Sequence, residues 1–237
     1  MVRRQVARGR DDGVENRRPG SRRDTIMKIA IIGAGQVGGT LGRAWAAAGH
    51  EIVFGVRDPA GNRVASVVAT TAGRARAAGV AEAAAGAEVV VLATPWPATE
   101  SAVREAGDLS GKVLIDCTNP LADDLSVLLV GRTSSGAELV ATWAPEARVV
   151  KAFNTTGFEN MADPDFHGRP ATMLIAGDDE AAKAIACGLA RDVGFDPVVA
   201  GPLTMARLLE PIALLWINLA LFRGHGTRVT FQLDRKA

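Results

Sequence analysis

Short apolar runs recur along most of the chain, and each one stops at a small or polar residue. Runs of this length without alternation are typical of strands that are buried on both faces of a parallel sheet. The predicted strands are 28–32, 50–56, 87–94, 112–118 and 147–154, followed later by 171–177, 195–201 and 227–233. Alanine-rich stretches between them predict helices. Strands that alternate with helices imply right-handed crossovers, so the predicted fold class is α/β, a doubly wound parallel sheet.

Helix start and stop signals support this pattern. Leu41, Trp45 and Ala48 follow helical spacing, and Gly49 is suited to end that helix. Ser135 and Glu138 form a capping box, in which the hydroxyl and the carboxylate each satisfy an end amide. A last helix, within 202–222, is expected to be broken or bent near Pro211.

The pattern divides the chain into three parts. Residues 1–26 are predicted to be a disordered basic extension, 27–157 a dinucleotide-binding Rossmann domain, and 158–237 a small C-terminal α/β lobe that packs against it. Arg-rich leaders also occur in export signals, but here acids, Gly and Pro follow the arginines instead of an apolar stretch. Such an extension can arise from an upstream start codon, in which case the natural start is Met27.

Charge separates the leader from the rest. Residues 1–26 contain eight arginines and four acidic residues, so they carry +4, whereas the whole chain of 237 residues carries +1. The remaining residues are therefore slightly acidic, which gives no reason to expect nucleic acid as a partner.

A glycine-rich turn carries the first chemical signal. Gly33, Gly35 and Gly38 stand between the first strand and the first helix as G-A-G-Q-V-G. The first glycine permits a tight turn, the second lets a pyrophosphate approach the backbone, and the third lets the helix pack closely on the strand. The predicted dinucleotide-binding turn therefore comprises Gly33, Ala34, Gly35, Gln36, Val37 and Gly38.

The end of the second strand indicates which dinucleotide binds. NAD sites usually place an acid there, whereas this chain places Arg57, whose planar fork can pair with a 2′-phosphate. Asn62 or Arg63 can assist it. The predicted cofactor is NADP, and Asp58 keeps NAD as the alternative because a small shift of register would offer its carboxylate to the ribose.

Ligands of doubly wound sheets lie beyond the carboxyl ends of the strands. Three further strands end in residues with uncharged hydrogen-bonding groups or flat apolar rings. The candidate binding residues at these ends are Thr94, Pro95, Trp96, Asn119, Phe153, Asn154 and Thr155. Of the acid–base groups nearby, only Asp116 and Lys151 stand out; Asp116 can be explained as a loop cap and Lys151 as a solvated charge. No catalytic residue is predicted.

Several segments together carry a family resemblance, namely "GAGQVGGTLG", "VFGVRDP", "VVVLATPWPA", "KAFNT" and "AGPLTMARLLEP". In this order over 27–237 they resemble the NADP-dependent oxidoreductases of the deazaflavin coenzyme F420. A similar domain forms the cytoplasmic part of metalloreductases that carry six membrane helices. The resemblance implies a Rossmann domain that binds NADP and a C-terminal lobe that closes a cleft over the nicotinamide.

The resemblance also implies roles for individual residues. Gly33 to Gly38 would hold the pyrophosphate, Arg57 the 2′-phosphate, and Thr94 to Trp96 would lie along the cofactor. Phe153, Asn154 and Thr155 would sit near the nicotinamide. Archaeal members tend to carry a histidine at the position of Asn154, and a small hydroxyl residue where this chain has Val56.

The predicted reaction is hydride transfer between NADPH and a deazaflavin or flavin-like ring, which needs positioning and exclusion of water more than an acid–base group. Two alternatives remain open. One is a reductase of a small carbonyl or imine, in which Lys151 or Asp116 would supply a proton. The other is a non-catalytic NADP-binding regulator.

Other features bear on location and assembly. Cys117 and Cys187 have no metal or redox spacing, and the three histidines are isolated, so no metal site is predicted. The run 211–222 is too short to span a bilayer. Its apolar residues are predicted to be core, with a homodimer interface or an acceptor pocket as alternatives. A cytoplasmic protein without membrane partners is the resulting expectation.

Overall fold

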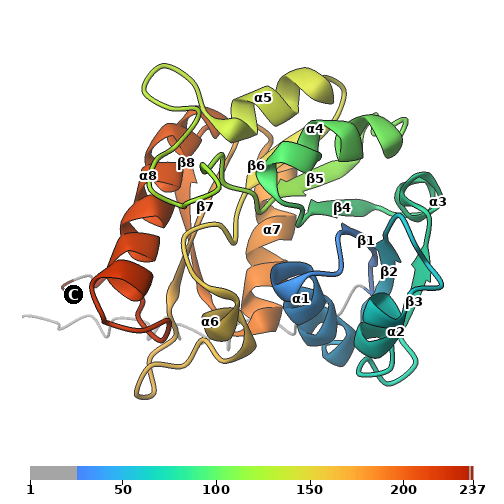
Figure 1. The fold of residues 1–237 in the computed structure, drawn as a ribbon, viewed down its shortest axis with the longest axis horizontal. Coiled ribbons are helices and arrows are strands. Elements are labelled where there is room, and N and C mark those ends of the chain that lie inside the picture. Colours follow the sequence, from blue (N-terminus) through green and yellow to red (C-terminus); the bar gives the residue numbers. More distant parts are fainter. Residues whose placement is uncertain (1–25, 235, 237) are drawn as a thin grey trace, which may run out of the picture.

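The computed structural model describes residues 26–234 and residue 236. Its centre is one eight-stranded sheet with the order β3-β2-β1-β4-β5-β6-β7-β8. All neighbouring strands run parallel except β6 and β7, which are antiparallel. The predicted doubly wound α/β fold is therefore confirmed, and Figure 1 shows its helices on both sides of the sheet.

The strands lie where the apolar runs predicted them, with one addition. Their bounds are β1 Lys28–Ile32, β2 Glu51–Gly55, β3 Ala75–Ala78, β4 Val89–Leu92, β5 Val113–Asp116, β6 Arg148–Lys151, β7 Thr172–Gly177 and β8 Asp196–Gly201. β3 was not predicted, because a short segment with an arginine in it lacks an apolar run. It forms the edge of the sheet beside β2.

Two apolar cores, one on each face, hold the helices to the sheet. The helices are α1 Gln36–Ala47, α2 Asn62–Val68, α3 Val80–Ala85, α4 Trp96–Glu105, α5 Gly136–Trp143, α6 Phe158–Ala162, α7 Glu180–Val193 and α8 Ala206–Ile217. Ile29 and Ile31 face a core shared with α1, α2, α6 and α7, whereas Ala30 and Ile32 face a core shared with α3, α4 and α5. This alternation along a buried strand is the period-2 geometry of a strand covered on both faces.

The segment 158–237 joins the same sheet. β7 pairs with β6 through Val150 and Gly177, and β8 continues the sheet from β7. The two strands assigned to a C-terminal lobe thus extend the dinucleotide-binding sheet. Of the predicted leader only Ile26, which is exposed, lies within the described residues.

The last helix differs from its prediction. α8 runs through Pro211 without a break, followed by a π-helical turn, Asn218–Phe222. Counted with the 3-10 turn that precedes α8, Leu203–Phe222 is long and apolar enough to cross a membrane by length and composition alone, and a third of it is buried in the molecule. This longer segment was not predicted, because the prediction considered only the run 211–222, which by itself is too short to span a bilayer. Of its apolar residues, Trp216 is core, whereas Leu215 and Phe222 are exposed.

The predicted strand 227–233 is also wrong, because this stretch is not part of any sheet. Side chains hold its backbone instead. The Val229 carbonyl accepts from Asn160 Nδ2 and Trp216 Nε1, both at 2.7 Å, and the Leu233 amide donates to Thr172 Oγ1 at 2.9 Å. Such bonds satisfy an extended segment without a neighbouring strand.

Candidate functional site: the carboxyl edge of the sheet

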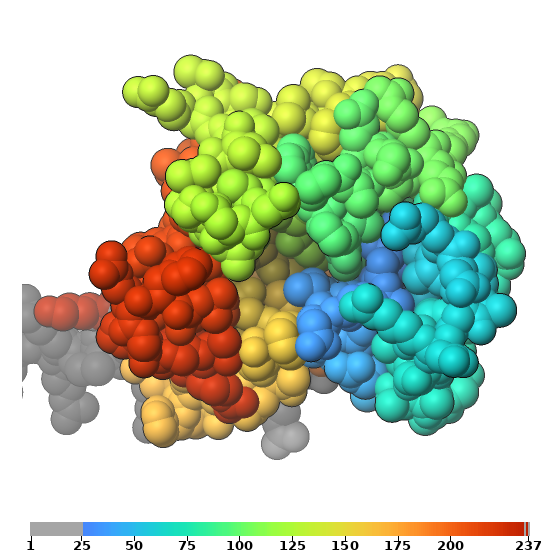
Figure 2. Space-filling model, in the orientation of Figure 1, coloured from blue at the N-terminus to red at the C-terminus, as the bar shows by residue number. Residues whose placement is uncertain are grey.

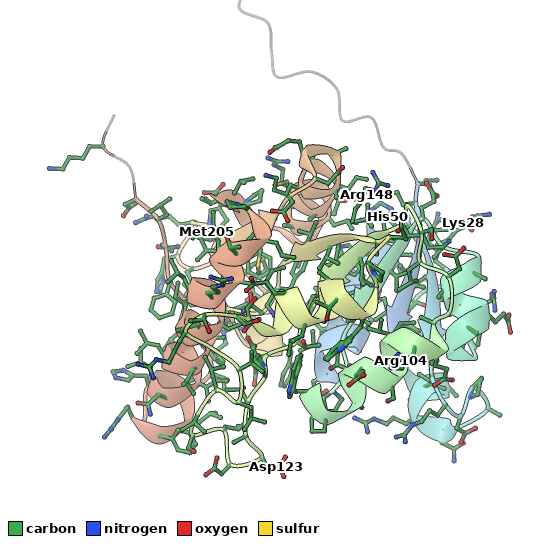
Figure 3. The ribbon with its side chains drawn as sticks, turned by 90° about the horizontal axis from the view of Figure 1, so that it is seen from above. Lys28, His50, Arg104, Asp123, Arg148 and Met205 are labelled. Atoms are coloured by element: carbon green, nitrogen blue, oxygen red, sulfur yellow. The ribbon has the colours of Figure 1, made fainter. Side chains whose placement is uncertain are left out.

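The loops that follow β1, β4, β5 and β6 meet at one edge of the molecule. Figure 3 places Lys28 and Arg148, at the starts of β1 and β6, on one side and Asp123, in the loop after β5, on the other. At this carboxyl edge the space-filling view is hollowed between α8, the loop after β5, and the first turns of α1 and α4 (Figure 2). The hollow lies beside the β1–β4 boundary, where the strand order reverses, which is the usual ligand position in such sheets.

The three glycines of the turn after β1 meet different surroundings. Gly33 has a φ of +106°, and a Cβ there would lie 2.6 Å from the Ala93 carbonyl oxygen. A Cβ on Gly38 would lie 2.0 Å from the Gly33 carbonyl oxygen. These two glycines are therefore required by the packing of the turn itself.

Gly35 differs because nothing in the protein crowds it. The one heavy atom near a Cβ placed there is Arg63 Nη2, at 4.0 Å, and Gly35 has an ordinary negative φ as the N-cap of α1. No side chain caps this helix. The turn thus leaves its amides and the positive end of α1 open to a ligand, which is the geometry that accepts a phosphate.

Arg57 stands just beyond β2 and is exposed, as are Asn62 and Arg63 at the start of α2. The three residues lie on the same side of the sheet edge as the turn after β1, because β2 is the neighbour of β1. Asp58 is exposed as well, in the turn that leads to Gly61.

The loop after β4 is held by hydrogen bonds to Thr99, in the first turns of α4. Thr94 Oγ1 lies 3.1 Å from Thr99 Oγ1, and Thr99 also donates to the Pro95 carbonyl. Trp96 is half-buried, with its ring centroid 5.6 Å from that of Trp143. The ring of Trp96 is therefore partly committed to α5 and presents only its remaining surface to the hollow.

Asn119 and Asn154 link the ends of β5 and β6. Asn119 Nδ2 donates to the Asn154 carbonyl and Asn154 Nδ2 donates to Asn119 Oδ1, both at 3.0 Å. Asn154 Nδ2 also donates to the Leu209 carbonyl at 3.3 Å, which fixes the orientation of the amide because a carbonyl can only accept. Asn154 Oδ1 is left buried without a partner among the described residues. Thr155 is buried beside it.

Phe153 does not provide the ring surface that the sequence predicted. It is 1% exposed, and its ring packs edge-on against Trp45 and Phe195 in the core. Its φ of +61° turns the chain sharply after β6, so that the side chain goes inward while the following residues reach the edge. Any contact of Phe153 with a ligand must come from its backbone.

Lys151 lies in a buried ion cluster that the sequence did not reveal. Its ammonium donates to Asp116 Oδ2 at 2.9 Å and to the Thr118 carbonyl at 2.6 Å, and it lies 2.9 Å from Glu210 Oε1. Burial alone would lower the pKa of Lys151, but the two carboxylates outweigh it and hold that pKa above its ordinary value. The interpretation of Lys151 as a solvated charge is therefore wrong.

Asp116 and Glu210 have further partners. Asp116 Oδ1 accepts from the Thr118 amide and hydroxyl, so Asp116 does cap the loop after β5. Glu210, from α8, accepts from the Gly136 and Ala137 amides at the start of α5. Glu210 lies far from Lys151 in the sequence, and no local pattern could have joined them.

The capping box at Ser135 is only half as predicted. Ser135 Oγ accepts from the Glu138 amide at 3.2 Å, but the Glu138 carboxylate binds the Ser135 hydroxyl and Arg207 of α8. The hydrogen bonds from Arg207, opposed by partial burial, lower the pKa of Glu138. Two charged residues of α8, Arg207 and Glu210, thus fasten it to α5.

Neither cysteine is suited to chemistry. Cys117 and Cys187 are free and buried, and burial raises the pKa of the Cys117 thiol, as does the neighbouring Asp116. Within the described part of the chain no group of three His, Cys, Asp or Glu side chains is arranged to hold a metal ion.

Comparisons with known proteins agree with the fold and with NADP as the cofactor. The family model for NADP oxidoreductases that depend on coenzyme F420 matches residues 28–120. A candidate F420-dependent NADP reductase from Arthrobacter sp. FB24, solved as a crystal structure, is 34% identical with a TM-score of 0.80, covering 88% of this chain and 100% of that one.

Two further matches carry other names. The metalloreductase STEAP3 of Rattus norvegicus is 31% identical over 188 residues, which is 79% of this chain, and the chain spans only 36% of that protein's length. A reductive aminase from Aspergillus terreus, solved with NADPH and ethyl levulinate, is 22% identical with a TM-score of 0.62, covering 84% of this chain and 64% of that one. That likeness concerns the fold alone.

Proposed function

Because the chain belongs to the family of coenzyme F420-dependent NADP oxidoreductases, whose nicotinamide cofactor is NADP, we propose that it transfers a hydride between NADPH and a deazaflavin or flavin-like ring. The cofactor supplies the hydride at its nicotinamide. The protein would hold the two rings against each other at the carboxyl edge of the sheet and exclude water from between them.

The turn after β1 would hold the pyrophosphate. The open space beside Gly35 and the uncapped amides of α1 fit a phosphate, whereas Gly33 and Gly38 shape the turn. Ala34, Gln36 and Val37 would contribute backbone. Arg57, which is exposed beyond β2, would pair with the 2′-phosphate and thereby favour NADP over NAD.

The remaining strand ends would hold the nicotinamide half. Thr94, Pro95 and Trp96 would lie along it from the loop after β4. Asn119 and Asn154 hydrogen-bond to each other, and among the residues that the structure describes no donor reaches the buried Asn154 Oδ1. Thr155 and the backbone of Phe153 would complete this wall.

The observation that carries the proposal is that the buried Lys151 ammonium has no N–H group free to donate to a substrate. Lys151 has three acceptors for its three N–H groups, namely Asp116, the Thr118 carbonyl and Glu210. A carbonyl or imine reductase needs a proton donor at the reacting centre. Hydride transfer between two stacked rings does not, because solvent can supply the accompanying proton.

Activity can be tested with a panel of acceptors. NADPH oxidation would be followed with oxidised F420, FMN, FAD, a ferric chelate and a cyclic imine, at equal concentrations. We expect turnover with F420 to exceed turnover with the others, and NADPH to be preferred over NADH.

The other outcomes select the alternatives. Turnover with the imine alone would indicate the small-substrate reductase, and turnover with the ferric chelate alone would indicate a metalloreductase activity. Tight NADPH binding without turnover of any acceptor would indicate a regulator. Each of these results would contradict ring-to-ring hydride transfer.

Division of labour, location and assembly follow the same proposal. Residues 27–157 would hold NADP, and 158–237 would close the cleft through α8. We propose a cytoplasmic protein, in which Leu203–Phe222 is a packed helix with the charged Glu210 buried at its inner face. A homodimer remains a prediction, which light scattering can test. The absence of membrane and nucleic-acid partners also remains a prediction.

A further inference from the structure

Arg63 lies where a pyrophosphate would meet it, although the sequence suggested only a supporting role at the 2′-phosphate. We infer that Arg63 binds the pyrophosphate of NADP, opposite the amides of the glycine turn, and that Arg57 alone serves the 2′-phosphate. This inference rests on the proposed NADP site and assigns the two arginines to different phosphates.

The position of the guanidinium is the first support. A Cβ on Gly35 would lie 4.0 Å from Arg63 Nη2, and apart from the residues next to Gly35 in the chain no other atom of the described residues comes that close. The missing side chain of the second glycine is what allows a pyrophosphate to approach such a turn. Arg63, at the start of α2, therefore stands on the phosphate side of Gly35.

The packing of α2 explains why Arg63 is held there. Val64 is buried in the core beneath α2, and Val67 lies 3.4 Å from the position that a Cβ on Gly39 would take. α2 thus lies across the first turn of α1, which fixes where the side chain at the start of α2 can reach. From that position the aliphatic part of the Arg63 side chain is long enough to bring its guanidinium next to Gly35.

Electrostatics is the second support. The first turn of α1 contains no acidic residue, and neither does that of α2. Within the described residues no carboxylate forms an ion pair with Arg63. A guanidinium beside the positive end of a helix is repelled until an anion binds between them, so this arrangement favours a doubly charged pyrophosphate.

Three probes separate the two phosphates. NADP carries both, ADP carries only the pyrophosphate, and 2′-AMP carries only the 2′-phosphate. Affinities would be measured by competition against NADPH fluorescence for the wild type, Arg63→Gln, Arg57→Gln and the control Arg104→Gln. Arg104 is an exposed arginine of α4 that pairs with Glu100, so its substitution removes the same charge away from the turn.

The expected pattern is a double dissociation. Arg63→Gln should weaken NADP and ADP by the same factor, about tenfold for one charge-assisted contact, and leave 2′-AMP within about twofold. Arg57→Gln should weaken NADP and 2′-AMP and leave ADP within the same margin. Arg104→Gln should change none of the three.

Other results overturn the inference. If Arg63→Gln weakens NADP and 2′-AMP but not ADP, Arg63 belongs to the 2′-phosphate. If it weakens all three equally, it acts only through overall charge, and if it weakens none, its side chain takes no part. Failure of the wild-type protein to bind NADP and ADP would instead overturn the proposed cofactor site itself.

Discussion

Two glycines of the same turn do different physical work. Gly38 is buried, and a Cβ there would lie 2.0 Å from a backbone oxygen, whereas Gly35 borders open space. A substitution at Gly38 must move the backbone of the turn. A substitution at Gly35 needs no movement of the protein and changes only what can approach the turn.

These two positions give a prediction at the residue scale. Gly35→Ala should change the free energy of unfolding by less than about 1 kcal/mol, since its φ suits alanine, but should weaken NADP binding at least about tenfold by crowding the phosphate. Gly38→Ala should lower the free energy of unfolding by about 2 kcal/mol or more. Denaturant unfolding and NADP titration measure both effects. Full NADP affinity in Gly35→Ala would contradict a pyrophosphate at this turn.

Single residues also show the limit of sequence reasoning. The glycine turn was predictable, because its three positions are close in the chain and each has a local role. The environment of Phe153 was not, because at a φ of +61° its side chain joins Val150 and Ala152 in one core, whereas strand alternation would have placed it on the opposite face with Val149.

At the scale of elements, a salt-bridge cluster joins β5, β6 and α8. Lys151 is fully buried between Asp116 and Glu210, and Glu210 also caps the first amides of α5. Buried carboxylates are tolerated only while their charge is compensated. The cluster therefore makes the attachment of α8 depend on a residue in the centre of the sheet.

Lys151→Met tests this dependence. It leaves two buried carboxylates without their cation, and we expect the free energy of unfolding to fall by about 3–5 kcal/mol at neutral pH. Lys28→Met, at an exposed position, is the control and should change stability by less than about 0.5 kcal/mol. A loss below about 1 kcal/mol in Lys151→Met would contradict the cluster.

The strands differ in how well the sequence predicted them. The apolar runs placed seven of the eight strands of the sheet, because a doubly covered strand must be apolar on both faces. The predicted strand 227–233 failed for the converse reason. Its alternating residues suit a strand, but the segment's own sequence does not determine whether another strand lies beside it to accept its hydrogen bonds.

At the scale of the whole molecule, the segment after α8 packs back against α6 and α8. The carbonyl of Val229 receives two donors, from the buried side chains of Asn160 and Trp216, and Arg228 pairs with Asp163. The segment after α8 thus packs against α6 and its following residue Asp163, and so links the C-terminal end of the described chain to the segment directly after β6.

Removal of residues 228–237 should therefore destabilise the protein. We expect a loss of about 2 kcal/mol, which corresponds to a fall of about 4–8 °C in Tm for a protein of this size. The truncation removes the Val229 carbonyl, and Trp216→Phe removes the indole N–H that donates to it in the full chain. If both changes act through the Val229 carbonyl, the combined variant should lose less stability than the sum of the two, as a double-mutant cycle would measure. Strict additivity would contradict this contact.

The sequence by itself determined seven of the eight strands of the sheet, the glycine turn after β1 and the uncharged groups at the strand ends. These properties depend on residues that are close together in the chain, where local sterics and the period of burial decide the outcome. The tertiary structure alone decided that Lys151 is neutralised by a carboxylate from α8, that Phe153 belongs to the core, and that Arg63 lies above Gly35. Each of these depends on which distant segments pack together, because burial and charge compensation are properties of the folded surroundings.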